Sequence, residues 1–504
     1  MKNLLELSRI ITKRKVRKIE IFDAATLKQK SSKFNEFYEA LVEGKLKNDR
    51  DAAKLLYDCT PTEDKYRQLK SRFRKRLLNT LFFIDINEPA ASNYDRAYFT
   101  ANKEWTQIRI LLQYNAKATA AQMARRLLTV ALKYEFADIV VNCCRILRQL
   151  AAEYGDEKEF EAYEDHLQYF LPVLHAELEA ESKYQHILLE YYRTDYTDEA
   201  FQKHMQQWCH ELVALSERHQ SPLIFYHMFL AWAMRFELAH DFRSVIEVCV
   251  QAEHYYRTHS KFYQARRLSD FYFHQLVALL HLRDFLRGKA VAEKAFKTLE
   301  LGSEQWFAFM ERYFLLAMHT ENYIQAMAVH GEVVGHNQFR KLPLEQRERW
   351  HIFEAWLAYF VEALSQVQPI LKAQQTKRFK VRQFLADPIL YPRHQRMFTV
   401  QKVTVQMLFF LERNQYNQAA DCVDRLRSYA RRQLKKDEYV RVVNFIRLLQ
   451  QLAKVDFDPQ RVQGADKYLT RLEAHPFFYR GLLYELEVVP YEQLWQFLLQ
   501  RLAK

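Results

Sequence analysis

The stretch Glu321-Asn322-Tyr323-Ile324-Gln325-Ala326 contains a pattern that is repeated along the chain: a polar pair, an aromatic residue and, three positions later, a small residue. Similar triplets occur at four other places: Tyr134-Glu135-Phe136, His240-Asp241-Phe242, Arg283-Asp284-Phe285 and Asn414-Gln415-Tyr416. A leucine or methionine lies three to five residues before each aromatic residue. Since offsets of three and four share a helix face, the pattern predicts that one helix ends at each triplet and the next begins there.

The residues after each aromatic position continue a helical face. The residues three positions later are small or aliphatic: Ile139, Val245, Gly288, Ala326 and Ala419. Those ten positions later are also apolar: Ile146, Ala252, Ala295, Val333 and Leu426. The intervals between the aromatic residues are 106, 43, 38 and 93 residues. We interpret the middle two as single helix–turn–helix repeats and the outer two as doubles, stacked so that each hairpin buries a face against its neighbour.

The triplets resemble the inter-helix turn of the tetratricopeptide repeat family. In that family the turn has glycine, then Asp or Asn, then an aromatic residue, with Ala three residues later. Glu321-Asn322-Tyr323 with Ala326 matches best, and Asn414-Gln415-Tyr416 with Ala419 is second. All five turns lack the family's glycine, and the period exceeds ~34 residues. The resemblance implies an all-α fold over about residues 100–450 in which antiparallel helix hairpins stack into a tetratricopeptide-like α-solenoid.

Composition supports a helical protein without catalytic machinery. The 504 residues include 8 glycines and 11 prolines, too few for the many tight turns of a β-sandwich or barrel. The sequence has no phosphate-binding glycine loop, no nucleophile elbow and no HExxH motif. Two ExxH pairs, Glu237 with His240 and Glu348 with His351, are expected from composition alone. The six cysteines lack zinc-ligand spacing, so we expect reduced thiols and neither metal nor cofactor.

The positive charge is concentrated at the N-terminal end. The net charge is +13, yet residues 1–80 hold 21 Lys or Arg against 11 Asp or Glu. Helices are expected at 33–42, 51–57 and 64–83, with Thr60 as the N-cap of the third, and a short strand at 17–23. We therefore expect a basic module at residues 1–90, helix-turn-helix or winged-helix-like, followed by a repeat array at residues 91–504 that ends in a capping helix at 490–502.

Basic residues of this module form the candidate site. They are Lys13, Arg14, Lys15, Arg17, Lys18, Arg67, Lys70, Arg72, Arg74, Lys75 and Arg76. They would contact nucleic acid or an acidic protein, or they would only solvate the outer face of a structural helix. A membrane surface is a weaker alternative, because the adjoining apolar face is short.

Two hypotheses of function follow from the sequence. The first is a non-enzymatic scaffold or adaptor, in which a helical-repeat surface binds a peptide or helix of a protein partner. The second is a regulator, whose N-terminal module binds nucleic acid while the helical array senses a partner. The apolar stretches are too short to span a bilayer, and the N-terminus lacks a secretory signal, so we expect a cytoplasmic protein.

Overall fold

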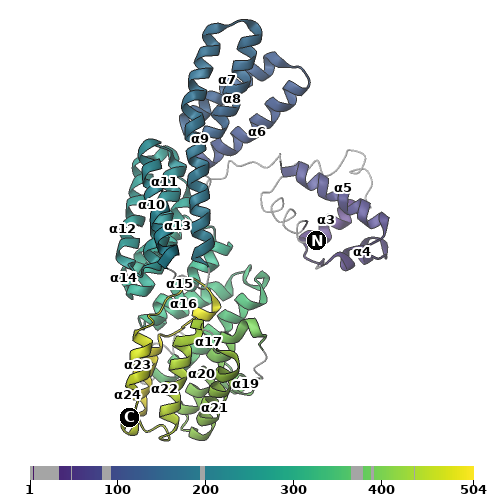
Figure 1. The fold of residues 1–504 in the computed structure, drawn as a ribbon. Helices are drawn as coiled ribbons and strands as arrows, with labels where there is room; N and C mark the ends of the chain where they lie inside the picture. The colour runs from purple at the N-terminus through teal and green to yellow at the C-terminus, as the bar shows by residue number, and fades with distance from the viewer. Residues whose placement is uncertain are drawn as a thin grey trace. The chain divides into compact units, whose positions relative to one another are not determined.

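The computed structural model describes residue 4 and residues 33–46, 48–81, 92–192, 199–364, 379–387, 391–435 and 437–503. Every secondary-structure element within these residues is a helix, which confirms the all-α prediction (Figure 1). The chain divides into two compact units, Met1–Pro172 and Val173–Lys504. The expected module boundary at residues 90 and 91 and the expected strand at 17–23 lie outside the described residues.

Three helices form the described part of the basic module. They are α3 (Lys33–Val42), α4 (Asp49–Tyr57) and α5 (Asp64–Thr80). Their apolar stripes pack on one another around Phe37, Leu56 and Phe73, which are almost fully buried. The N-cap of α5 lies three residues later than expected: it is Glu63, and the Thr60 N–H donates to Glu63 Oε1 at 2.9 Å. Thr60 is therefore part of the turn that precedes the helix.

Four helices follow, and the last of them crosses the boundary between the units. They are α6 (Asn93–Gln113), α7 (Lys117–Tyr134), α8 (Ala137–Tyr154) and α9 (Glu157–Tyr191). Helix α6 contacts α7 and α8, and α7 contacts α8. The unit boundary falls inside α9 at Pro172, whose ring removes one main-chain donor from the helix.

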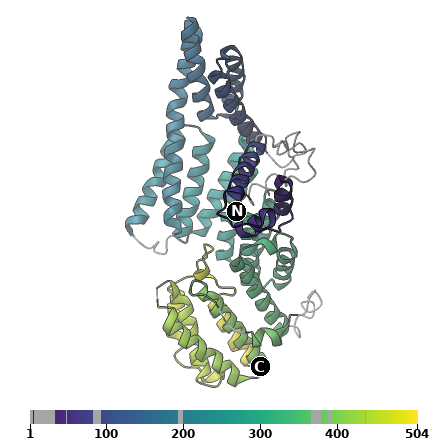
Figure 2. The same ribbon diagram turned by 90° about the vertical axis from the view of Figure 1, so that its right-hand side faces the viewer.

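The second unit is built from helices that contact their neighbours in the chain (Figures 1 and 2). Its first helices are α10 (Glu199–Arg218), α11 (Pro222–Leu238), α12 (Phe242–Thr258), α13 (Ala265–Leu282), α14 (Phe285–Ala295), α15 (Glu304–His319) and α16 (Tyr323–Gly335). Its later helices are α17 (Leu344–Leu364), α19 (Val381–Ala386), α20 (Arg396–Glu412), α21 (Tyr416–Gln433), α22 (Val440–Ala453), α23 (Asp466–Glu473) and α24 (Tyr491–Leu502). Contacts also join α11 to α13 and α13 to α15.

The structure places a turn at each of the five triplets, as the sequence predicts. One residue at each turn has a left-handed conformation, with φ between 53° and 59°: Glu135, His240, Arg283, Glu321 and Asn414. The next helix begins at the aromatic residue in four cases, and one residue after it at Phe136. An L-residue in this conformation costs about 1 kcal/mol or more, which glycine avoids. The five turns thus adopt the left-handed conformation without glycine.

Aspartates at two of these turns explain where the following helices start. The Asp241 carboxylate accepts from the Ser244 N–H at 3.2 Å, and the Asp284 carboxylate accepts from the Arg287 N–H at 3.1 Å. Each bond satisfies a main-chain donor that the first helical turn leaves without a partner.

Helix α15 is apolar around most of its circumference. Its side chains from Phe309 to His319 are all buried, including the charged Glu311 and Arg312. Such a helix requires neighbours on several sides. Helices α13, α14 and α16 contact it, and residues 474–490 cover a further side.

Residues 474–490 connect α23 to α24, and we call them the inner segment. The inner segment contains one short 3-10 turn, Leu483–Glu485, and otherwise has no regular helix. It is the yellow chain beside α15 and α16 in Figure 1. The predicted closing helix is confirmed as α24, with Pro490 as its N-cap. Among the described helices, none combines the length and the apolar character needed to cross a membrane.

Candidate functional site: an inner surface that holds an extended segment

Side chains from four helices, α13, α15, α20 and α22, bind the main chain of the inner segment. We call these the inner helices, and the surface that they present to the segment the inner surface. His281 Nε2 on α13 accepts from the Tyr479 N–H at 3.1 Å, and Arg312 Nη2 on α15 donates to the Arg480 carbonyl at 3.0 Å. Gln401 on α20 donates to the Leu486 carbonyl at 3.0 Å. His319 on α15 and Arg441 on α22 donate to the carbonyls of Glu487 and His475 at 2.8 and 2.5 Å. These five hydrogen bonds all involve the main chain of the segment.

Gly481 allows the closest approach between the segment and α15. Its φ is 104°, a conformation that L side chains rarely adopt. A Cβ at this position would lie 2.2 Å from Arg312 Nη2, the atom that donates to the Arg480 carbonyl. Glycine is therefore required here both for the backbone conformation and for the Arg312 contact.

A buried charged cluster anchors Tyr479. The Tyr479 hydroxyl donates to Glu311, and Arg349 Nη1 on α17 donates to Glu311 at 2.7 Å and to the Tyr479 hydroxyl at 3.1 Å. Burial alone would raise the pKa of the Glu311 carboxyl, but the Arg349 and Arg312 guanidinium groups hold it below its usual value. Removal of Arg349 or Glu311 would leave a buried charge without a partner. The cluster therefore favours a single position of Tyr479.

Two further ion pairs involve side chains of the segment. Arg441 donates to both oxygens of Glu487, at 2.5 and 3.0 Å, and also to Glu492. Arg480 donates to Glu485 at 2.7 Å and to the carbonyl of Tyr191 at 2.6 Å. Burial raises the pKa of both Glu485 and Glu487 despite these arginines.

A cavity of about 870 Å³ lies beside these ion pairs. Arg441, Arg480, Glu485 and Glu487 line it, together with residues of α10, α22 and the turn after α11. Arg441 pairs with Glu487 and Arg480 pairs with Glu485, so these four side chains hold the inner segment in place.

Two histidines contact the segment in their neutral form. Burial lowers the pKa of His281 to about 4 and that of His319 to about 3. His281 donates through Nδ1 to the Val277 carbonyl at 2.7 Å, which leaves Nε2 as the acceptor for the Tyr479 N–H. Protonation of His281 would therefore remove this acceptor.

Glu237 does not pair with His240, its ExxH partner in the sequence. Glu237 is fully buried, and its carboxylate accepts from the Tyr191 hydroxyl at 2.5 Å and contacts His274 Nδ1 at 2.6 Å. Burial opposes a charge on His274, yet the Glu237 carboxylate raises the pKa of His274 above its usual value. Within the described residues, no group of three or more His, Cys, Asp or Glu is placed to hold a metal ion.

The predicted basic site falls into two parts. Lys13, Arg14, Lys15, Arg17 and Lys18 lie outside the described residues. The other six residues belong to α5: Arg67, Lys70, Arg72, Arg74, Lys75 and Arg76. The helix buries Tyr66, Leu69, Phe73 and Leu77 in the module core, so its cations lie on the remaining surface.

The cations of α5 differ in their partners. Lys70 Nζ lies 2.7 Å from Asp49 Oδ1, Arg67 lies 3.5 Å from Asp64, and Arg76 packs over the Phe34 ring at 4.6 Å. Arg72 donates to the amide oxygen of Gln68 at 3.3 Å. Arg74 and Lys75 are exposed and form no ion pair within the described part of the chain. Among the described residues of α5, Arg72, Arg74 and Lys75 are thus cations that form no ion pair with an acid.

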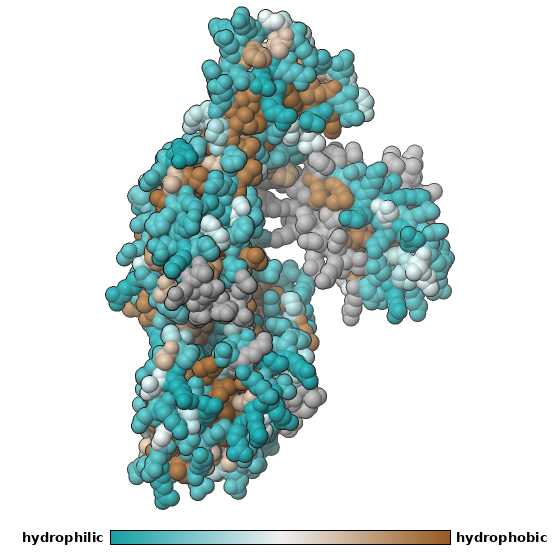
Figure 3. Space-filling view, in the orientation of Figure 1, coloured by the Kyte–Doolittle hydropathy of each residue, from teal (hydrophilic) through white to brown (hydrophobic). Residues whose placement is uncertain are grey.

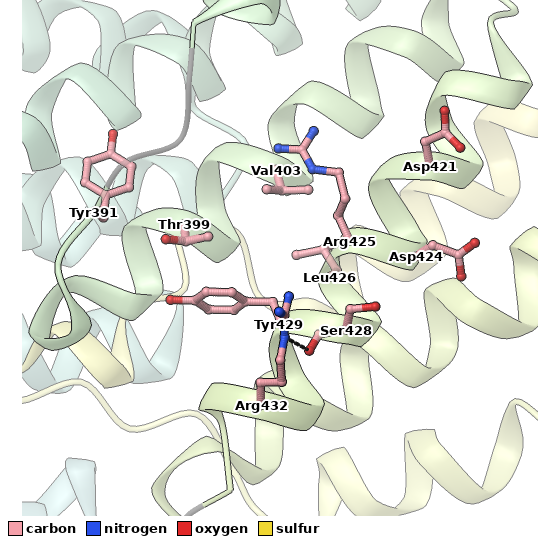
Figure 4. Close-up of a pocket in the computed structure, with 10 residues that line it drawn as sticks. All are labelled: Tyr391, Thr399, Val403, Asp421, Asp424, Arg425, Leu426, Ser428, Tyr429 and Arg432. Atoms are coloured by element: carbon pink, nitrogen blue, oxygen red, sulfur yellow. Dashed lines mark hydrogen bonds between the residues drawn. The ribbon is translucent and has the colours of Figure 1, made fainter.

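A second hollow, of about 740 Å³, lies beside α20 and α21 (Figure 4). Its charged lining includes Asp421, Asp424, Arg425 and Arg432, and Arg432 donates to the Ser428 carbonyl at 3.2 Å. These four side chains are exposed and carry charges of both signs. We assign no ligand to this hollow.

No protein-family model matches the chain, and searches of curated proteins and of solved structures return no significant similarity. Function is therefore inferred from the residues of the two sites. Sequence reasoning identified the α5 cations but missed the inner segment and the side chains that bind it. The local signals for that segment were Pro476, Gly481 and Pro490, which interrupt helical periodicity without indicating a binding surface.

Proposed function

We propose that the protein is a non-enzymatic interaction scaffold and that its second unit is a tetratricopeptide-like α-solenoid. The inner helices α13, α15, α20 and α22 would bind an extended peptide of a protein partner. The contacts between α11 and α13 and between α13 and α15 support the solenoid, because stacked repeats bring alternate helices together. The left-handed turns at the five triplets support the resemblance to the tetratricopeptide family.

One observation carries the peptide-binding proposal: the inner helices hold the inner segment through its main chain. His281, Arg312, Gln401 and His319 all contact a backbone N–H or carbonyl. Main-chain recognition of an extended peptide provides affinity, while side-chain contacts such as Tyr479 with Glu311 provide selectivity. A partner with an extended aromatic segment would make the same contacts.

In this proposal the partner exchanges with the inner segment. Each hydrogen bond that the segment loses is replaced by one to the partner, so the exchange has a small net cost in hydrogen bonding. Helices α23 and α24 tether the segment at both ends, which gives it a high effective concentration at its own site. The segment therefore competes with the partner for the same site. A partner must bind more tightly than the tethered segment in order to displace it.

The buried carboxylates Glu311 and Glu487 are bound by arginines, which favours a role in binding over one in catalysis. Glu311 and Glu487 are engaged by Arg349 and Arg441 and hold Tyr479 and the end of the inner segment. Acid–base catalysis requires a carboxyl group within reach of a substrate proton. These carboxylates instead serve the structure of the inner surface.

The proposal is tested with a fluorescein-labelled synthetic peptide of residues 476–490, titrated by fluorescence anisotropy. The full-length wild type is compared with Gly481→Ala, which weakens the resident segment, and with Gly464→Ala, whose glycine has a positive φ but no heavy atom within 4 Å of the position that a Cβ would occupy. We expect Gly481→Ala to bind the peptide at least tenfold more tightly than wild type and Gly464→Ala, because the resident competitor is weakened. A scrambled peptide should not bind.

If none of the three proteins binds the peptide in preference to its scrambled form, the inner surface is not a peptide site. Circular dichroism of each variant establishes that it is folded before the titration. Should Gly481→Ala not fold, the test is native-state hydrogen exchange of the wild-type inner segment, measured with and without the unlabelled peptide.

A further inference from the structure

Helix α5 concentrates positive charge on a surface that the core of the module fixes in place. From Lys65 to Leu81 the sequence contains seven Lys or Arg and no Asp or Glu. Tyr66, Phe73 and Leu77 are completely buried, so the helix cannot rotate its cations away from the surface. The cations from position 65 to 76 extend along about 16 Å of the helix axis.

Apart from Asp64 in its first turn, the acidic residues of the described part of the module lie outside α5. Helices α3 and α4 and the turns beside them hold Glu36, Glu39, Glu43, Asp49, Asp51 and Asp58. Nearby acidic residues form ion pairs with cations of the first half of α5: Asp64 pairs with Arg67, and Asp49 pairs with Lys70. The uncompensated charge lies in the second half, at Arg72, Arg74 and Lys75.

The residues around Arg72, Arg74 and Lys75 indicate which kind of anionic partner this surface of α5 binds. A protein interface usually has an apolar core in which charged residues are depleted, and a membrane-binding helix inserts an apolar face. Most apolar side chains of α5 pack in the module's own core, and the exposed residues beside the three cations are Ser71, Asn79 and Leu78, which is 41% exposed. In the view of Figure 3 the described part of the module presents a mainly hydrophilic surface. A single exposed leucine is too small an apolar face for a protein interface core or for insertion into a membrane, whereas the guanidinium and ammonium groups fit the phosphates of a nucleic acid.

We propose that Arg72, Arg74 and Lys75 bind the phosphate backbone of nucleic acid. The contact is electrostatic and independent of base sequence, and α5 supplies a rigid support for it. This activity is distinct from peptide binding by the second unit, and neither depends on the other.

The test is fluorescence anisotropy of full-length protein with labelled random-sequence 30-mers, as duplex DNA, single-stranded DNA and duplex RNA, between 50 and 300 mM salt. Three phosphate contacts predict a slope of log K against log salt of about −2.7 on duplex DNA. The triple substitution Arg72→Gln, Arg74→Gln, Lys75→Gln should weaken binding at least tenfold at 50 mM salt and flatten the slope. All three residues are exposed, so the variant keeps its fold.

The matched control removes the same charge from α21 and the turn after it, through Arg427→Gln, Arg431→Gln and Lys435→Gln. These residues are exposed too, and the control should bind within twofold of wild type. The proposal is overturned if wild type shows no salt-dependent binding at 50 mM, or if the α5 variant binds as wild type does. It is also overturned if poly-glutamate or phosphatidylserine vesicles bind as tightly as nucleic acid, which would assign the face to an acidic protein or a lipid surface.

Discussion

Substitution of Gly481 by alanine should destabilise the second unit by about 3 kcal/mol. The φ of 104° costs an L-residue about 1–3 kcal/mol. The new Cβ would lie 2.2 Å from Arg312 Nη2, so the guanidinium must move and lose its bond to the Arg480 carbonyl. A hydrogen bond to a charged group contributes about 1.5–3 kcal/mol. The smaller backbone entropy of alanine in the unfolded chain offsets up to about 1 kcal/mol of this loss.

This change is measurable by thermal and urea unfolding. For a unit of roughly 330 residues, 3 kcal/mol corresponds to a fall in Tm of about 4 °C. Two controls separate the two causes. Gly464→Ala places an alanine at a positive φ of 68° where a Cβ has no close contact, and it should cost about 1 kcal/mol. Gly331→Ala lies in α16, where a Cβ has open space, and it should be neutral or slightly stabilising. If Gly481→Ala is no more destabilising than Gly464→Ala, the Arg312 contact contributes nothing and our reasoning about the inner surface is wrong.

Three further predictions concern the turns, the buried histidines and the charged cluster. Arg283→Gly should stabilise the protein by about 0.5–1 kcal/mol in urea unfolding, because it removes left-handed strain, whereas Arg283→Ala should not. The pKa values of His281 and His319, about 4 and 3, lie below the unfolded value near 6.5, so their contribution to stability is complete above pH 6.5 and is lost as the pH falls toward 4. The free energy of unfolding should therefore fall steeply between pH 6.5 and 4, and less steeply in His281→Gln; a flat profile contradicts their burial. Arg349→Met should cost about 3–5 kcal/mol in urea unfolding, because it leaves the Glu311 carboxylate buried without its main partner; a loss under 1 kcal/mol would show that the cluster is solvated.

The sequence predicted those parts of the fold that depend on local chemistry. The five turns were recognisable because an apolar residue closes one helix, a polar pair follows and an aromatic residue opens the next. Val245, Ala326 and Ala419, three residues into their helices, are fully buried as their spacing predicts. The range 33–42 matches α3 in full.

The inner surface was not predictable in the same way, because its contacts join distant parts of the chain. Tyr479 and His281 are 198 positions apart, and Arg480 and Arg312 are 168 apart. No periodicity in residues 474–490 indicates which helices will cover them. Glu237 shows the same limit: its i+3 neighbour His240 lies in the turn beyond the end of α11, so the carboxylate pairs instead with His274 on α13.

Native-state hydrogen exchange of the wild-type protein tests whether the inner helices hold a segment that can leave its site and be replaced by a partner. The amide of Tyr479 donates to His281 Nε2 and reports on this contact. We predict that the amides of residues 477–487 exchange through a local opening with a free energy several kcal/mol below that of α15, and that unlabelled peptide 476–490 accelerates this exchange. If these amides exchange only with global unfolding, the segment is a permanent part of the core and the inner surface is not a binding site.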